Sequence, residues 1–244
     1  MPNSVEIRFC GDLQDLLSHS HRKGALCYDY SGSPAVKDGI EACGVPHTEV
    51  DLILADGRSV DFSYRLQGDH SLEVFPPDYP ADRARWLVPS KPEPVSFVLD
   101  VHLGKLARRL RLLGFDCLYR NDYPDREIIH DALVQQRAIL TRDRGILKHR
   151  SVIYGLLIRS DRVDEQIREV FRRYLLTTSQ LLLEQRCPLC NGVLEAVEKS
   201  RIRDRLLPKT IQYYSDFLQC SNCGKIYWEG AHFRAARAWL NRLP

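Results

Sequence analysis

Residues 95–120, VSFVLDVHLGKLARRLRLLGFDCLYR, combine strand-like and helix-like patterns that indicate the type of fold. Residues 95–100 form an apolar run that ends in aspartate, which is typical of a strand buried on both faces of a sheet. Apolar side chains then recur at helical spacing over residues 103–113, and Gly114 ends that helix. Residues 115–120 return to a strand pattern. We therefore expect a strand, a crossover helix and a second strand.

The same alternation continues along the chain. Residues 125–136 predict a helix, residues 137–141 and 152–159 predict strands, and residues 164–175 predict a strongly amphipathic helix. Strands that alternate with helices favour a parallel sheet with right-handed crossovers. The fold class predicted for residues 95–180 is therefore α/β with a parallel sheet.

Residues 1–80 show a different order, in which strands predominate. VEIRF and ALCYDYSG have strand patterns, a helical pattern follows them, and residues 71–76 form a last strand. Before that strand, Asp56-Gly57 is a strong signal for a hairpin turn. We therefore predict a small α+β domain. Its order of elements resembles the ubiquitin-like β-grasp fold of the sulfur-carrier type.

Sulfur carriers of that type end in a free Gly-Gly tail, whereas here the last strand runs into FPPDYP, residues 75–80. No C-terminal thiocarboxylate can form there, which disfavours a role in sulfur transfer. We interpret residues 1–80 as a recognition or docking module for a protein or ribonucleoprotein partner. Residues 81–94 contain three prolines among charged residues, which predicts a proline-rich, extended linker.

Charge is divided unevenly along the 244 residues, although the net charge is only +3. Residues 1–80 hold 6 Lys and Arg against 13 Asp and Glu, whereas residues 96–180 hold 16 against 11 and residues 181–244 hold 10 against 6. The basic part favours a polyanionic partner such as RNA. No apolar run approaches the roughly 18 residues of a membrane span, and the start lacks a signal-peptide pattern. We therefore expect a cytoplasmic protein with no membrane partner.

Three aspartates follow successive predicted strands of the parallel sheet, where open sheets bind their ligands. They are Asp100, Asp125 and Asp143. Clustered carboxylates do not remain ionised side by side without a compensating cation, so we expect them to bind Mg²⁺ or Mn²⁺. Such a metal can promote hydrolysis of a phosphodiester. The alternatives are a strand end for Asp100, a helix N-cap for Asp125 and a turn for Asp143, and Asp122 is a rival in the same loop as Asp125.

Basic side chains adjoin two of these aspartates. Lys105 and Arg108 begin the helix that follows Asp100, while Arg142 and Arg144 flank Asp143. Their positions predict contacts with substrate phosphates. The alternative is a solvated helix face and local neutralisation of the acids.

Two CxxC pairs, RCPLCNG and QCSNCGK, are separated by 29 residues near the end of the chain. Each pair can form a tight knuckle, so Cys187, Cys190, Cys220 and Cys223 predict one tetrahedral zinc site. Four thiolates fill the coordination shell, which indicates a structural zinc rather than a catalytic one. The residues after each pair, Asn191-Gly192 and Gly224, supply the positive φ that the turns require. Iron bound by the same sulfurs and a redox dithiol are the alternatives.

Aromatic and basic residues are concentrated around these cysteines. Most of the aromatic rings are expected to pack within the small module, but an exposed ring beside the basic SRIRDRLLPK segment, residues 200–209, would stack on an unpaired base.

The motifs VLDVHLGKLARRLRLLGFD, ILTRDRGIL, RCPLCNG and CGKIYWEG closely resemble the PIN-like RNase domain named after the C-terminal region of the exonuclease Mut-7. The resemblance covers the chain from Val95 onward, and bacterial members of that family commonly carry an N-terminal ubiquitin-like domain. It implies a PIN-like nuclease domain over residues 95–180 and a zinc ribbon over residues 181–244.

The resemblance also assigns the family's acidic positions to Asp100, Asp125 and Asp143, which favours Asp125 over Asp122. A fourth acidic position found in many PIN nucleases has no clear counterpart before Asp161.

Two functions follow as hypotheses. The first is a ribonuclease dependent on Mg²⁺ or Mn²⁺, in which the zinc ribbon aids RNA binding. The second is an RNA-binding or ribonucleoprotein-binding factor with weak or no hydrolysis, recruited through residues 1–80, and the absent fourth acid favours it.

Overall fold

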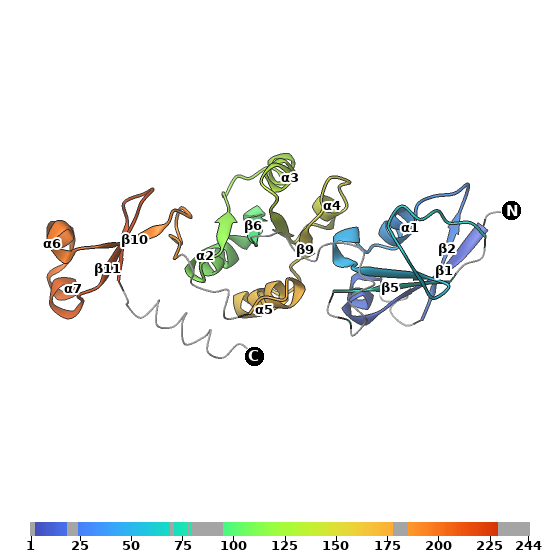
Figure 1. Ribbon diagram of the computed structural model, residues 1–244, viewed down its shortest axis with the longest axis horizontal. Helices are drawn as coiled ribbons and strands as arrows, with labels where there is room; N and C mark the ends of the chain where they lie inside the picture. Colours follow the sequence, from blue (N-terminus) through green and yellow to red (C-terminus); the bar gives the residue numbers. More distant parts are fainter. Residues whose placement is uncertain are drawn as a thin grey trace.

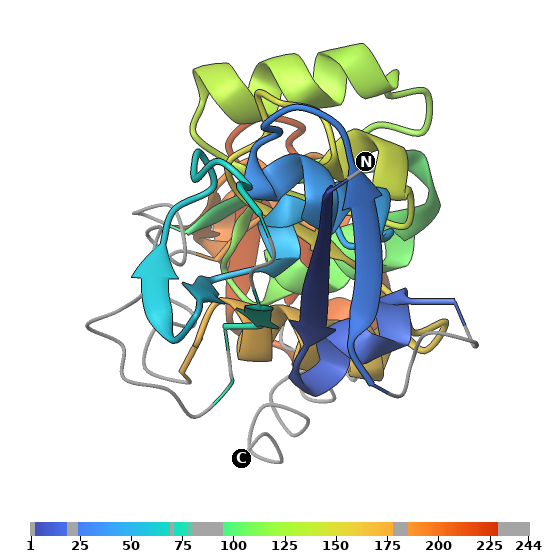
Figure 2. The same ribbon diagram turned by 90° about the vertical axis from the view of Figure 1, so that its right-hand side faces the viewer.

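The computed structural model describes residues 3–18, 24–68, 71–77, 79, 95–177 and 185–228. Within them the chain forms three β-sheets, which belong to an N-terminal domain, a central domain and a C-terminal module. The three lie in a row, with the central domain between the other two (Figure 1). Viewed along that row, the N-terminal domain stands in front of the central one (Figure 2). The predicted linker, residues 81–94, lies outside the described residues.

The N-terminal domain is a five-stranded sheet with the order β2-β1-β5-β3-β4. Only the pairing of β1 with β5 is parallel. The alternation of β1 buries every second side chain, as expected for a sheet with one face on a core. This is the β-grasp arrangement that the sequence predicted. The elements are β1 (Asn3–Phe9), η1 (Gly11–Leu16), β2 (Leu26–Tyr30), α1 (Val36–Ala42), η3 (His47–Glu49), β3 (Leu52–Ala55), β4 (Arg58–Val60) and β5 (Ser71–Phe75).

The predicted hairpin turn connects β3 with β4. Asp56 and Gly57 have φ angles of 48° and 76°, the positive values that a two-residue hairpin turn requires at both central positions.

The central domain is a four-stranded parallel sheet with the order β7-β6-β8-β9. Helices α2 and α5 cover one face, where Phe97 and Leu99 point, and α3 covers the other, where Val98 points (Figure 1). This confirms the predicted α/β fold. Its elements are β6 (Ser96–Leu99), η5 (Val101–Leu103), α2 (Gly104–Leu112), β7 (Asp116–Leu118), α3 (Asp125–Val134), β8 (Ala138–Thr141), α4 (Arg144–Leu147), β9 (Gly155–Leu157) and α5 (Val163–Arg173).

Strand β9 is shorter than the predicted strand over residues 152–159. The carbonyl of Val152 lies 2.7 Å from Nε2 of His47 in the N-terminal domain instead of pairing in the sheet. A contact between domains has therefore replaced the first part of the expected strand.

The C-terminal module is a three-stranded antiparallel sheet with two short α-helices and a 3-10 helix inserted between its first two strands. Its hydrophobic core is small: among the described residues one cluster holds Cys187, Leu194 and Cys220, and Ile202 and Phe217 are also buried. The arrangement is that of the predicted zinc ribbon. The elements are β10 (Leu194–Val197), α6 (Lys199–Ile202), η7 (Arg203–Arg205), α7 (Pro208–Tyr213), β11 (Phe217–Cys220) and β12 (Ile226–Trp228).

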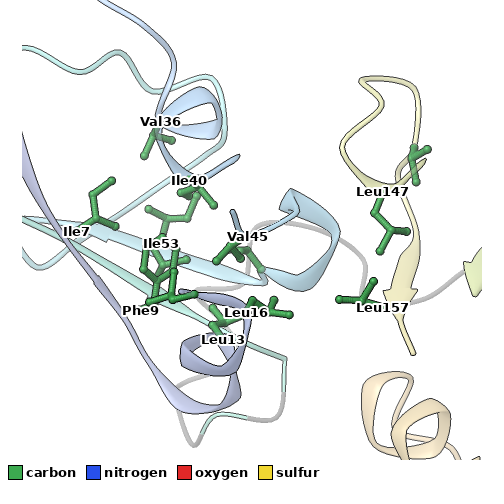
Figure 3. Close-up of a cluster of buried hydrophobic side chains, with 14 of the residues drawn as sticks. Ile7, Phe9, Leu13, Leu16, Val36, Ile40, Val45, Ile53, Leu147 and Leu157 are labelled. Atoms are coloured by element: carbon green, nitrogen blue, oxygen red, sulfur yellow. The ribbon is translucent and has the colours of Figure 1, made fainter. Parts of the chain in front are cut away.

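The N-terminal and central domains share one hydrophobic core. Leu16 and Val45 of the first domain face Leu147 and Leu157 of the second (Figure 3), and all four belong to the same cluster of buried side chains. The N-terminal domain is therefore packed firmly on the central sheet and is not merely tethered to it.

Replacing Leu147 tests this shared core. Leu147→Ala deletes a side chain that is fully buried, so we expect the free energy of unfolding to fall by about 2–5 kcal/mol. In urea-induced unfolding, probes in the N-terminal and central domains should shift together. Leu133→Ala, at a side chain that is 52% exposed, is the matched control and should change little. A shift confined to the central domain would contradict the shared core.

Candidate functional site

Asp100 lies at the carboxyl end of β6, and its buried carboxylate is held by three donors. The backbone N–H of His102 donates to Oδ1 at 2.8 Å, and the backbone N–H of Arg142 donates to Oδ2 at 2.8 Å. The Thr141 hydroxyl also donates to Oδ2. Since a carboxylate oxygen accepts two hydrogen bonds, Oδ1 retains one lone pair for a further ligand.

Thr141 connects Asp100 with the neighbouring aspartate. The backbone N–H of Asp143 donates to the Thr141 hydroxyl oxygen at 2.9 Å, and that hydroxyl in turn donates to Asp100. The Asp143 side chain caps α4 by accepting the Gly145 N–H at 2.6 Å. The ends of β6 and β8 are thus joined through one buried hydroxyl, and two predicted site residues lie on either side of it.

Asp125 is exposed and is the first residue of α3, after Pro124 at the N-cap. Among the described residues, the carboxylates of Asp100, Asp125 and Asp143 do not form a group whose oxygens lie within 4.8 Å of one another. The structure joins Asp100 to the backbone of Asp143 through Thr141, and the metal-binding roles of all three aspartates remain predictions. Asp122, the rival of Asp125, is also exposed.

The four predicted phosphate-binding residues differ in what they contact. Lys105 and Arg108 are exposed on α2, and no ion pair involving them occurs among the described residues. Arg142 forms an ion pair with Asp161, a weak interaction because both side chains are well exposed. Arg144 donates to the backbone carbonyl of Leu16 at 2.8 Å, and so joins the N-terminal domain to the helix that Asp143 caps.

Tyr119 is a further residue at this edge that sequence reasoning missed. Its hydroxyl lies 3.0 Å from the carbonyl of Val101, directly after Asp100. A Cβ at Gly104 would lie only 2.5 Å from that hydroxyl. Glycine at the start of α2 therefore lets Tyr119 lie over the loop that follows Asp100. In the sequence, a glycine in the first turn of a helix was the one sign that another group approaches the backbone there.

The four cysteines of the two knuckles form a compact cluster. Their sulfurs all lie within 4.8 Å of one another, with Cys187 and Cys223 separated by 3.7 Å and Cys190 and Cys220 by 3.4 Å. Tetrahedral zinc with bonds of about 2.3 Å requires sulfurs about 3.8 Å apart, so the cluster fits that ion. Within the described part of the chain it is the only such group of three or more metal-binding side chains.

The backbone turns of the knuckles agree in part with the predicted positive φ angles. Asn191 and Gly224 have φ angles of 69° and 68°, as expected. Gly192 does not have a positive φ. Glycine is required there because a Cβ would lie 2.8 Å from the sulfur of Cys220.

Burial raises the pKa of Cys190, but hydrogen bonds from the Gly192 N–H and the neighbouring thiols lower it, whereas the same thiols raise the pKa of Cys223. The first ionisation in the cluster is therefore easier than that of an isolated thiol. This favours the thiolate that a metal needs.

Two family models match the chain. Residues 95–240 match the Mut7-C RNAse domain, and residues 2–82 match the Mut7-C ubiquitin domain. The chain belongs to the Mut7-C RNAse domain family. No curated protein matches it. Within the described residues no helix is both long and apolar enough to cross a membrane.

In this Mut7-C RNAse domain, Asn191 joins the first knuckle to the edge of the parallel sheet. Its side-chain oxygen accepts the Cys117 backbone N–H of β7 at 3.0 Å, and its amide nitrogen donates to Asp116 at 2.7 Å. Arg111 completes the contact from α2, because its buried guanidinium donates to the carbonyls of Cys117, Pro188 and Leu189.

Asp116 stays ionised in this contact. Burial alone would raise its pKa, but hydrogen bonds from Arg137 and Asn191 outweigh burial and lower the pKa below its ordinary value. The stabilisation is therefore present above the unfolded-state pKa and is lost as the pH falls through the lower folded-state pKa.

Asn191→Gly tests this junction, because glycine keeps the positive φ and removes only the side chain. We expect faster hydrogen exchange at the Cys117 amide and a loss of about 1–3 kcal/mol in the free energy of unfolding, since a buried N–H loses its acceptor. Asn222→Ala, at an exposed asparagine between the two cysteines of the second knuckle, is the control. Unchanged exchange at Cys117 would show that the knuckle does not close this edge.

Proposed function

We propose that this protein is a metal-dependent ribonuclease that hydrolyses RNA phosphodiester bonds at the carboxyl edge of its central sheet. The observation that carries the proposal is the buried Asp100 carboxylate, joined through the Thr141 hydroxyl to the loop of Asp143. Membership of an RNAse domain family and carboxylates at the ends of adjacent parallel strands support the same chemistry.

Asp100 and Asp143 would hold Mg²⁺ or Mn²⁺, with Asp125 as a further acidic ligand. The free lone pair on Oδ1 of Asp100 and the remaining oxygen of Asp143 suit a hard cation. When bound, the metal would polarise the phosphodiester and lower the pKa of the attacking water. The chain itself supplies a fixed position for both carboxylates before any substrate arrives.

Basic side chains would then position the RNA. Lys105 and Arg108 are exposed beside the start of α2 and are available to contact phosphate oxygens. Arg142 could exchange its weak pairing with Asp161 for a phosphate. Arg144 would have to leave the Leu16 carbonyl to do the same.

We also propose that the four cysteines hold one structural zinc ion. Four thiolates leave no open coordination position for catalysis. The small core of the module supports this role, because so few buried side chains cannot stabilise a fold of that size alone. The zinc ribbon would aid RNA binding.

Asp143→Asn is the direct test of the proposed activity. The asparagine keeps an oxygen to cap α4 but loses the negative charge, so the protein should fold while Mn²⁺-dependent cleavage of RNA falls by about 100-fold or more. Cleavage rates of a labelled oligoribonucleotide give the measurement. Asp122→Asn is the control and should retain the native rate. Full cleavage by Asp143→Asn would remove the catalytic assignment.

Thr141 is a positioning residue, and two substitutions separate its hydroxyl from its shape. Thr141→Val removes the hydroxyl that holds Asp100, so we expect weaker Mn²⁺ affinity together with a lower kcat. Thr141→Ser keeps the hydroxyl and should remain close to the native protein in both. Equal Mn²⁺ affinity in the two variants would show that the hydroxyl does not position the metal site.

The second candidate is an RNA-binding or ribonucleoprotein-binding factor. Among the described residues the three carboxylates do not gather within 4.8 Å of one another, which favours it. Such a factor would bind RNA in a salt-dependent manner without cleaving it at any Mn²⁺ concentration.

A further inference from the structure

Residues 199–214, between β10 and β11, form an inserted arm of the C-terminal module whose role the metal site does not explain. The arm comprises α6, η7 and α7 and lies at the end of the molecule remote from the N-terminal domain (Figure 1). Ile202 and Thr210 are buried within it, and the Lys199 ammonium group donates to the carbonyl of Ile211. The arm is therefore a packed element with a defined surface.

The arm is also joined to the metal site. The Arg205 guanidinium donates to the carbonyl of Gly224 at 2.7 Å, directly after the last cysteine of the second knuckle. Its orientation thus depends on the knuckle, and a bound zinc ion would fix both together.

The exposed side of the arm is strongly basic. Between Lys199 and Tyr214 the chain has five basic residues and one acidic residue. Arg203 and Lys209 are exposed, and neither makes an ion pair within the part of the chain that the structure describes. The one recorded pair, Arg201 with Glu198, is 3.8 Å long and exposed to solvent, so it contributes little.

The arm also carries an exposed aromatic ring. Tyr213 is 70% exposed, whereas Tyr214 and Phe217 each contact the ring of Trp228. On α7, Lys209 and Tyr213 are four residues apart, so they lie on one helix face. That face presents a cation one helical turn from an exposed ring.

The combination fits single-stranded nucleic acid better than a protein. Protein interfaces have apolar centres depleted of charge, whereas here the exposed ring lies one helical turn from Lys209, in a segment with five basic residues and one acidic residue. Phosphates require the cations, and an unpaired base requires an aromatic surface on which to stack.

We propose that residues 199–214 bind single-stranded RNA, with Arg203 and Lys209 contacting phosphates and Tyr213 stacking on an unpaired base. This deepens the proposed function, on which it rests for the choice of RNA. The arm holds a single-stranded part of the substrate while the carboxylates of the central sheet act on another.

The test measures RNA binding separately from hydrolysis. Full-length, zinc-loaded protein is titrated against fluorescein-labelled oligouridylate without added Mg²⁺ or Mn²⁺, and anisotropy gives the affinity at several salt concentrations. Tyr213→Ala should weaken binding by about 5- to 100-fold, and Tyr213→Phe should not, because it keeps the ring. Arg203→Gln with Lys209→Gln should reduce the slope of log affinity against log salt by about 1.4, for two contacts to a single strand.

Matched controls remove two charges from the acidic N-terminal domain, at Lys37 and Arg58, and should leave the affinity and the salt slope unchanged. Zinc content confirms that each variant retains its module. Native affinity in both Tyr213→Ala and the Arg203 and Lys209 double variant would overturn the proposal. Equal losses by Tyr213→Ala and Tyr213→Phe would overturn the stacking role.

Hydrolysis of bis(p-nitrophenyl) phosphate with Mn²⁺ separates this inference from the proposed function. The arm variants should hydrolyse this small diester at the native rate, because it cannot span to the arm. A different result is a protein that binds RNA through the arm yet hydrolyses neither RNA nor bis(p-nitrophenyl) phosphate. That result would support RNA binding by the arm and contradict the proposed ribonuclease activity.

Discussion

The two outer strands of the central parallel sheet, β7 and β9, need hydrogen-bond partners from outside the sheet. A parallel sheet exposes unpaired backbone groups along its outer strands, and such groups must find partners when they are buried. At β9 the Leu157 N–H donates to Oε1 of Glu49 at 2.6 Å. At β7 the Cys117 N–H donates to Oδ1 of Asn191 at 3.0 Å. The N-terminal domain closes one edge and the first knuckle closes the other.

Closure of the β9 edge requires a buried carboxylate, and the surrounding residues make that possible. Burial raises the pKa of Glu49, although the Leu157 N–H and Arg159 favour its ionised form. Arg159 lies 3.3 Å from Glu49 and 3.0 Å from Asp12. Nearby, Arg173 donates to the carbonyl of Thr48 at 2.7 Å. The N-terminal domain thus contributes charged groups, as well as apolar ones, to the central fold, and Arg144 extends the same contact to the helix capped by Asp143.

Much of the architecture was predictable from local patterns. The apolar run before Asp100, the Asp56-Gly57 turn and the two CxxC pairs each act through residues close in sequence, so their structural meaning can be recognised without the fold. The contacts between modules have no such signal. Glu49 and Leu157 are separated by more than 100 residues. Arg111 belongs to a helix with other basic residues, and it is buried because its guanidinium donates to carbonyls of the first knuckle. Thr141 likewise reads as an ordinary strand residue until the fold brings it against Asp100.

The central sheet also explains the position of the proposed metal site. Once both edges are closed, the carboxyl ends of β6 and β8 are held in place, and Asp100 and Asp143 lie there on either side of Thr141. The most direct measurement is an anomalous difference map from crystals of the full-length protein soaked in Mn²⁺. We expect a manganese peak within coordination distance of the carboxylates of Asp100 and Asp143, absent in Asp100→Asn crystals. A well-ordered edge with no peak there would contradict the proposed metal site.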